Sequence, residues 1–327
     1  MKKKLTKKVD ESSIKIDPKF EERYKIILGD RYEEFISVSL TPLNKAIRIN
    51  TLKISKQDFL KRFSDNFVFR QVPWCDEGFW LNHKADGRYD LGNIVEHALG
   101  YFYVQDPASM IPPVVLDPKP GEFILDMCAA PGSKSTQIAQ YMKGKGVLFL
   151  NDSMPDRLKA LEINVRRMGI TNAILTYLQG THLTKLIRNN ILFDKILLDA
   201  PCSGSGTIRK SYKTLLKYST NFVKTMSSTQ RKLIDAAYEL LKPGGTLVYS
   251  TCTLEPDENE GIISYFLEKH NDVFTEEINI PLKRSEVFLD WNGEKYNSGV
   301  KNCLRIYPQD NDTEGFFVCK IRKLKKQ

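Results

Sequence analysis

The chain has 327 residues, of which 41% are hydrophobic and 27% charged, as in a soluble globular protein of one large or two ordinary domains. No apolar run approaches the roughly 18 uncharged residues of a membrane helix, and the basic start MKKKLTKKVDESS lacks the apolar stretch of a secretory signal. The net charge of +9 favours a polyanionic partner such as a nucleic acid.

Cysteine and histidine spacing bears on metal sites and on location. The six cysteines are scattered without a CxxC pair, and the four histidines fall outside metal-ligand spacing. Reduced thiols in a chain without a signal peptide predict a cytoplasmic protein, or a nuclear or nucleolar one in a eukaryote. We expect no metal site, no membrane association and a monomer. Residues 1–13 fit a nuclear address or an RNA-binding arm, and most simply a solvated chain end.

The first third of the chain mixes helical and strand-like segments. Residues 19–39 have helical periodicity, and residues 55–65 predict a helix that begins after an N-cap serine. The segments AIRINTLK, NFVFRQVPW and GFWLN predict strands. Residues 1–115 therefore predict a small α+β module with a basic N-terminal arm.

The pattern changes after a proline-rich stretch. IPPVVLDPKPGE (Ile111–Glu122) contains four prolines, which favours an extended linker. Beyond it, FILDMC, GVLFLND, AILTYL, FDKILLDAP and PGGTLVYSTC predict five short buried strands that alternate with helical segments. Residues 116–327 thus predict a Rossmann-like α/β domain with a parallel sheet and right-handed crossovers. FFVCKIRK predicts a last strand at or near an edge.

The carboxyl ends of the strands are where such a sheet binds its ligand. After the first strand, the small residues from Ala129 to Gly132 let the backbone approach a ligand, and Ser133 begins a helix whose amides can hold an anion. The second strand ends in Asp152, which can accept both ribose hydroxyls of a nucleoside. Each feature alone also fits an ordinary turn or helix cap. Together, without GxGxxG or GxxxxGK[ST], they favour a nucleoside with an amino-acid tail, and S-adenosylmethionine fits.

Two cysteines follow the fourth and fifth strands. LLDAPCSGSGTIRK places Asp199 and Cys202 at the same sheet edge as Cys252 in LVYSTC. A lone thiol there would be a small buried hydrophobe, but two thiols beside an aspartate and a cofactor pocket indicate catalysis. C5 of cytosine becomes nucleophilic once a thiolate adds at C6, and an acid near N3 offsets the charge on the ring. Cytosine-C5 methylation therefore needs one thiol, one carboxyl group and one further acid or base.

The acidic loop EPDENE follows Cys252 directly. We interpret it as a solvated loop that caps the next helix through Asp257, with Glu258 and Glu260 favourable in the first helical turn.

A cytosine stacked in a helix cannot reach Cys252, so we expect a flipped-out or looped target.

At this point the motifs resemble a known family. LDMCAAPGSKSTQ, LLDAPCSGSGTIRK and YSTCTLEPDENE together resemble the Nol/Nop/Sun (NSUN, RsmB-type) family of RNA cytosine-C5 methyltransferases. AIRINTLK, YVQDPASMIPP and RIYPQDNDTEGFF are similar to its flanking motifs, so the resemblance spans roughly residues 45–320. The set looks most like archaeal tRNA members, and nucleolar rRNA members are also similar. The resemblance implies S-adenosylmethionine as cofactor, RNA as partner with tRNA favoured over rRNA, and an N-terminal module that helps to grip RNA.

The same resemblance implies roles for individual residues. Cys252 corresponds to the nucleophile that attacks C6, and Cys202 to the cysteine that helps to break the covalent adduct. Asp199 would contact the target base and assist protonation near N3, and Lys134 would help to order that group. The residues expected at the cofactor site are Cys128, Ala129, Ala130, Pro131, Gly132, Ser133, Lys134, Asp152, Arg157, Gln179 and Asp199.

Departures and alternatives remain. Gln179 stands where family members commonly carry an acid, and Gln309 where a histidine often follows the proline. A DNA cytosine-C5 methyltransferase is one alternative, because those enzymes use a Pro-Cys cysteine as nucleophile, although the thiol of Cys252 would then be unexplained. A non-catalytic RNA-binding protein of the same fold is another, and the intact motifs argue against it.

Overall fold

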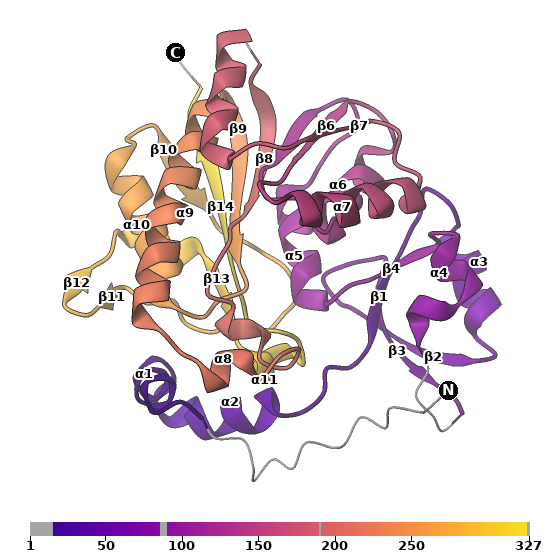
Figure 1. Ribbon diagram of the computed structural model, residues 1–327, viewed down its shortest axis with the longest axis horizontal. Helices are drawn as coiled ribbons and strands as arrows, with labels where there is room; N and C mark the ends of the chain where they lie inside the picture. The colour runs from indigo at the N-terminus through magenta and orange to yellow at the C-terminus, as the bar shows by residue number, and fades with distance from the viewer. Residues whose placement is uncertain (1–15, 86–89, 190, 326–327) are drawn as a thin grey trace.

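The computed structural model describes residues 16–85, 90–189 and 191–325 (Figure 1). The basic arm at residues 1–13 lies outside this part of the chain. A four-stranded sheet occupies the N-terminal third, and an eight-stranded sheet occupies the remainder. Within the described ranges, none of the helices combines the length and apolar character needed to span a membrane.

The N-terminal third confirms the predicted α+β pattern. Its elements are α1 (Pro18–Leu28), α2 (Tyr32–Ser39), β1 (Ala46–Ile49), α3 (Lys56–Phe63), β2 (Phe67–Gln71), β3 (Gly78–His83), α4 (Val95–Ala98) and β4 (Phe102–Val104). The strands pair antiparallel in the order β2-β3-β1-β4. Ser55 caps α3 as predicted, accepting the Asp58 N–H at 3.1 Å. The helical stretch 19–39 is broken at Gly29, whose φ of 54° ends α1.

Helices α1 and α2 pack on the C-terminal part of the chain. Buried aromatic residues of α1 and α2, including Phe20 and Tyr24, share a core cluster with Tyr218, Leu254 and Trp291. Figure 1 shows both helices beneath the C-terminal half, apart from the four-stranded sheet. Residues 16–40 therefore complete the core of the larger part of the molecule.

The proline-rich stretch is where the linker prediction is wrong. α5 (Pro107–Leu116) includes residues 111–116, and Asp106 caps it by accepting the Ala108 N–H at 2.9 Å. Pro112 and Pro113 lie inside the helix, where each removes a backbone donor. Burial offsets that loss, because Ile111 and its neighbours enter the core beneath the large sheet.

The large sheet has the predicted parallel centre. Five strands lie in the order β7-β6-β5-β8-β9, and every neighbouring pair is parallel. They are β5 (Phe123–Asp126), β6 (Val147–Asn151), β7 (Ala173–Thr176), β8 (Phe193–Asp199) and β9 (Leu241–Thr251). The helices between and after them are α6 (Ser133–Met142), α7 (Pro155–Met168), α8 (Lys213–Leu216), α9 (Thr220–Leu240) and α10 (Glu260–Lys269). This is the predicted Rossmann-like α/β fold.

An antiparallel extension continues the sheet beyond β9. β14 (Phe316–Lys323) pairs with β9 and lies one strand inside the edge formed by β10 (Val273–Glu276), with β13 (Leu304–Ile306) also paired to it. The prediction of a last strand near an edge is confirmed. The remaining short elements are β11 (Asp290–Trp291), β12 (Glu294–Lys295) and α11 (Pro308–Asn311).

Arg48 of β1 ties the two sheets together. Its guanidinium is fully buried and donates to Gln105 at 2.9 Å, Gln140 at 3.0 Å and Thr136 at 2.8 Å. Burial lowers the pKa of Arg48. Because Thr136 and Gln140 belong to α6, the N-terminal sheet is fixed against the helix that follows the small-residue turn.

Candidate active site

The strand ends bring the predicted groups to one edge of the sheet. Asp126 ends β5 and Asp199 ends β8, while Asp152 and Cys252 directly follow β6 and β9. β14 is antiparallel to β9, so its first residue, Phe316, lies at the same edge. A cavity of about 350 Å³ opens there. The predicted residues that line it are Cys128, Ala129, Ala130, Pro131, Ser133, Lys134, Arg157, Asp199 and Cys252.

Four of the predicted residues, Gly132, Asp152, Gln179 and Cys202, do not line this cavity. Gly132, with φ 108°, precedes α6, and Gln179 is exposed after β7. Asp152 is 2% exposed and accepts the N–H groups of Ala130 at 3.1 Å and Met154 at 3.0 Å. These hydrogen bonds support the turn, and the cofactor roles of all the predicted site residues remain predictions.

The two thiols are in contact but differ in access. The Sγ atoms of Cys202 and Cys252 are 3.3 Å apart, and only Cys252 lines the cavity. The hydrogen bond to Cys252, together with burial, raises the pKa of Cys202 well above its ordinary value. Cys202 therefore stays protonated at neutral pH. Of the two thiols, Cys252 is the one open to a ligand in the cavity.

Lys134 and Asp199 form an ion pair on the cavity wall. Lys134 Nζ lies 2.7 Å from Asp199 Oδ2, and Ser250 Oγ donates to Asp199 Oδ1 at 2.8 Å. The ammonium also lies 5.1 Å from the ring centroid of Phe316. Both carboxylate oxygens are thus oriented by donors, as a group that positions a ring needs to be.

The turn after β5 combines a buried acid with an uncapped helix. Burial raises the pKa of Asp126 to about 7, and Ser135 Oγ donates to this carboxyl group at 2.7 Å. Among the residues that the structure describes, no side chain caps α6, and Gly132 occupies its N-cap position. The first amides of α6 are therefore available for an anionic group.

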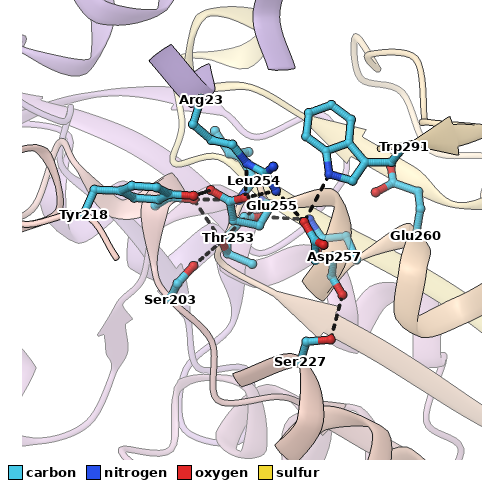
Figure 2. Close-up of polar contacts among 12 residues, drawn as sticks. Arg23, Ser203, Tyr218, Ser227, Thr253, Leu254, Glu255, Asp257, Glu260 and Trp291 are labelled. Carbon is cyan, nitrogen blue, oxygen red and sulfur yellow. Dashed lines mark hydrogen bonds and ion pairs between the residues drawn. The ribbon is translucent and has the colours of Figure 1, made fainter. Parts of the chain in front are cut away.

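The acidic loop after Cys252 is buried, and its interpretation as a solvated cap is wrong. Glu255, Glu258 and Glu260 are each 0% exposed. Asn259, not Asp257, precedes α10, and Asp257 instead pairs with Arg23 and accepts the indole N–H of Trp291 at 3.2 Å. Figure 2 shows these groups converging from α1, the loop and β11.

Each buried acid of the loop has partners that the sequence does not reveal. Arg23 lies 3.0 Å from Glu255, which also accepts the Tyr218 hydroxyl at 2.9 Å (Figure 2). Arg305 lies 2.5 Å from Glu260, and both side chains are fully buried. The segment after the candidate nucleophile is therefore fixed by distant cations.

Glu258 connects the two cysteine loops. Its Oε2 accepts the Ser203 N–H at 3.0 Å and the Gln230 side chain at 2.8 Å, and burial raises the pKa of Glu258 to about 7. Thr253 adds a second connection, because its hydroxyl lies 2.7 Å from that of Ser203. These contacts hold Cys202 against Cys252.

Sequence reasoning missed part of the cavity wall. Tyr103, Gln105, Asp106, Lys210, Glu314 and Phe316 line it. All six lie in or beside the segments YVQDPAS, GTIRK and TEGFF. The spacing of these residues along the chain does not indicate that they meet. They come together because β4 of the small sheet, the loop after β8 and the start of β14 all border the same cavity.

Fold and site define a class, the Rossmann-like S-adenosylmethionine-dependent methyltransferases. The family model for the 16S rRNA methyltransferase RsmB/F matches residues 113–322, and that for the N-terminal domain of 16S rRNA methyltransferase RsmF matches residues 16–107. The chain belongs to the RsmB/F family of methyltransferases, as the motif resemblance predicted.

Two curated relatives align along most of the chain. A tRNA (cytosine(49)-C(5))-methyltransferase of Pyrococcus abyssi is 46% identical over 310 residues, which are 94% of this chain and 97% of that protein. Ribosomal RNA small subunit methyltransferase F of Shewanella piezotolerans is 42% identical over 297 residues, 89% of this chain. The match spans only 60% of that relative's length.

Solved structures share the whole architecture. A methyltransferase homologue from Pyrococcus horikoshii has a TM-score of 0.83 at 40% identity, covering 93% of this chain and 94% of that one. NSun6 from Pyrococcus horikoshii, solved with SFG, an analogue of S-adenosylmethionine, has a TM-score of 0.82 at 26% identity and covers 95% of this chain and 99% of that one. The predicted fold class, with its N-terminal module, is confirmed.

Proposed function

We propose that this protein methylates C5 of cytosine in RNA, with tRNA as the favoured substrate and rRNA as the alternative. The observation that carries the proposal is the thiol of Cys252 on the wall of a cavity that the ion-paired Asp199 also lines, with the Cys202 Sγ atom 3.3 Å from the Cys252 Sγ atom. tRNA is favoured because the tRNA-modifying relative matches over 97% of its length, whereas the ribosomal relative matches over 60%.

The turn after β5 fits S-adenosylmethionine. The uncapped amides of α6 suit the carboxylate of an amino-acid tail, and the small residues 129–132 leave room for a close approach. A Cβ on Gly132 would lie 3.0 Å from Leu161, which shows how closely the turn is packed. Bound there, S-adenosylmethionine would supply the methyl group for C5.

Cys252, Asp199 and Lys134 would prepare the base for methylation. The Cys252 thiolate adds to C6, and the electron pair of the C5–C6 double bond shifts toward C5 and N3. Asp199, held by Lys134 and Ser250, would take the proton that the Cys252 thiol loses and pass it to N3, which offsets that charge. The protonated Cys202 then donates to the Cys252 sulfur as the C6–S bond breaks.

The first test uses methyl-labelled S-adenosylmethionine with an unmodified tRNA transcript, an rRNA fragment and a DNA of matched sequence. We expect label on C5 of cytosine in RNA, and none with Cys252→Ala. Cys202→Ala should instead trap a covalent RNA–protein adduct, because breakdown of the adduct lacks its proton donor.

Opposite outcomes would identify the alternatives. An adduct with Cys252→Ala and none with Cys202→Ala would exchange the roles of the two thiols, and equal labelling of DNA would support a DNA methyltransferase. RNA binding without affinity for S-adenosylmethionine in calorimetry would support a non-catalytic protein. A monomeric state and a cytoplasmic location belong to the same proposal, and light scattering and cell fractionation test them.

A further inference from the structure

Glu314 lines the same cavity as Cys252, and the steps above leave its carboxyl group without a role. Backbone hydrogen bonds place it there: the Gly206 N–H donates to the Cys252 carbonyl at 2.9 Å, and the Gly315 N–H donates to the Gly206 carbonyl at 2.9 Å. Any Cβ on Gly206 would lie 2.3 Å from the Gly315 carbonyl oxygen and 2.8 Å from that of Cys252. The three segments are therefore in close backbone contact, and both Glu314 and Cys252 line the cavity.

The surroundings of Glu314 suit a group that exchanges a proton. Its side chain is 3% exposed, one oxygen lies 2.7 Å from Lys210 Nζ, and the other has no hydrogen-bond partner in the described part of the chain. Burial, and next the charge of Asp106, raise the pKa of Glu314 to about 7, against the opposing charges of Lys210 and Lys134. A carboxyl group with a pKa near neutrality can both take and release a proton.

Strand order places Glu314 opposite the proposed cofactor turn. Along the sheet edge, Glu314 precedes β14, Cys252 follows β9, Asp199 ends β8, and the turn follows β5. A methyl group that arrives at C5 from the turn displaces the C5 hydrogen toward the other side, where Cys252 and Glu314 lie. Cys202 is less suited to remove that hydrogen, because it is protonated and does not line the cavity.

We infer that Glu314 is the base that removes the C5 proton from the methylated adduct, an assignment that rests on the proposed function. The C5–H bond breaks and its proton passes to the Glu314 carboxylate. The electron pair of that bond forms the C5–C6 double bond, and the C6–S pair returns to the sulfur of Cys252. Lys210 positions the carboxylate through its ion pair.

The decisive experiment uses tRNA with tritium at C5 of cytosine and methyl-labelled S-adenosylmethionine. With Glu314→Gln we expect a covalent adduct that carries both the methyl label and the tritium, and tritium release slowed by about 100-fold or more. Glu277→Gln, at an exposed site, should release tritium at the wild-type rate. Formate added to Glu314→Ala should restore part of the release, because it supplies the missing base.

A second variant reads out the same group without replacing it. Lys210→Met removes a positive charge that lowers the Glu314 pKa, so tritium release should reach half its maximum at a higher pH than in wild type. Wild-type tritium release by Glu314→Gln would overturn the inference. So would loss of the methylated adduct in folded Glu314→Gln, or an unshifted pH profile with Lys210→Met. If the proposed function itself fails, the wild-type protein releases no tritium.

Discussion

At the scale of single residues, the site depends on carboxyl groups kept away from water. Asp126, Glu258 and Glu314 each have a pKa raised to about 7, with burial as the largest cause. Ionising a buried carboxyl group costs free energy, so each of these acids lowers the stability of the fold when it is charged. All three surround the strand ends that carry the thiols, and a catalytic cavity is where such a cost is expected.

Glu258 gives a pH-dependent stability that can be measured. The native state holds its proton more tightly than the unfolded chain, so its contribution to stability falls as pH rises from about 4.5 to about 7. The loss should amount to about 3 kcal/mol above pH 7. Glu258→Gln should therefore lose less unfolding free energy than wild type between pH 5 and pH 8 in urea titrations. The exposed Glu268→Gln should follow wild type, and an unchanged pH slope in Glu258→Gln would contradict the prediction.

At the scale of elements, α1 fixes the loop that follows Cys252, the candidate nucleophile. Its Arg23 reaches both Glu255 and Asp257 and lies 4.6 Å from the Trp291 ring centroid (Figure 2). The loop thereby obtains its charge partners from a helix more than 200 residues earlier in the chain. Loops fixed by such distant contacts hold an adjoining catalytic group in one position.

Removing the Arg23 side chain should lower the free energy of unfolding. Arg23→Met leaves the fully buried Glu255 without its cation, and we expect a loss of about 3–5 kcal/mol in the free energy of unfolding. Lys25→Met on the same helix breaks an exposed ion pair with Glu21 and should leave the urea midpoint close to that of wild type. Urea titration distinguishes them. Adding Glu255→Gln to Arg23→Met should recover stability, and no recovery would show that the arginine acts through packing alone.

At the scale of the whole molecule, the N-terminal third and the methyltransferase sheet share their cores. α5 packs beneath the large sheet, and α1 and α2 pack against residues around Tyr218 and Trp291. The division at residue 115 predicted from the sequence cuts α5, while the family models match residues 16–107 and 113–322. The core around the methyltransferase sheet thus includes residues from the N-terminal third of the chain.

A fragment of residues 116–327 should not fold cooperatively. It lacks α5 and the aromatic clusters of α1 and α2, so large apolar surfaces would face water. The full chain is the reference, and its melting transition in circular dichroism should be missing from the fragment. Cooperative melting of fragment 116–327 near the full-chain temperature would show instead that the large sheet is independent.

The sequence by itself determined the class of fold and predicted most of the residues that line the candidate site. Strand and helix periods are local, so the β5-to-β9 alternation was readable, and the motifs around Cys202 and Cys252 placed both thiols at one edge. The proline content predicted a linker where residues 111–116 are helical, because burial there outweighs the lost backbone hydrogen bonds. Only the tertiary structure decided which thiol faces the cavity, that the EPDENE loop is buried on Arg23 and Arg305, and that Glu314 lines the same cavity as Cys252. Those outcomes depend on contacts between residues far apart in the chain, which no local pattern records.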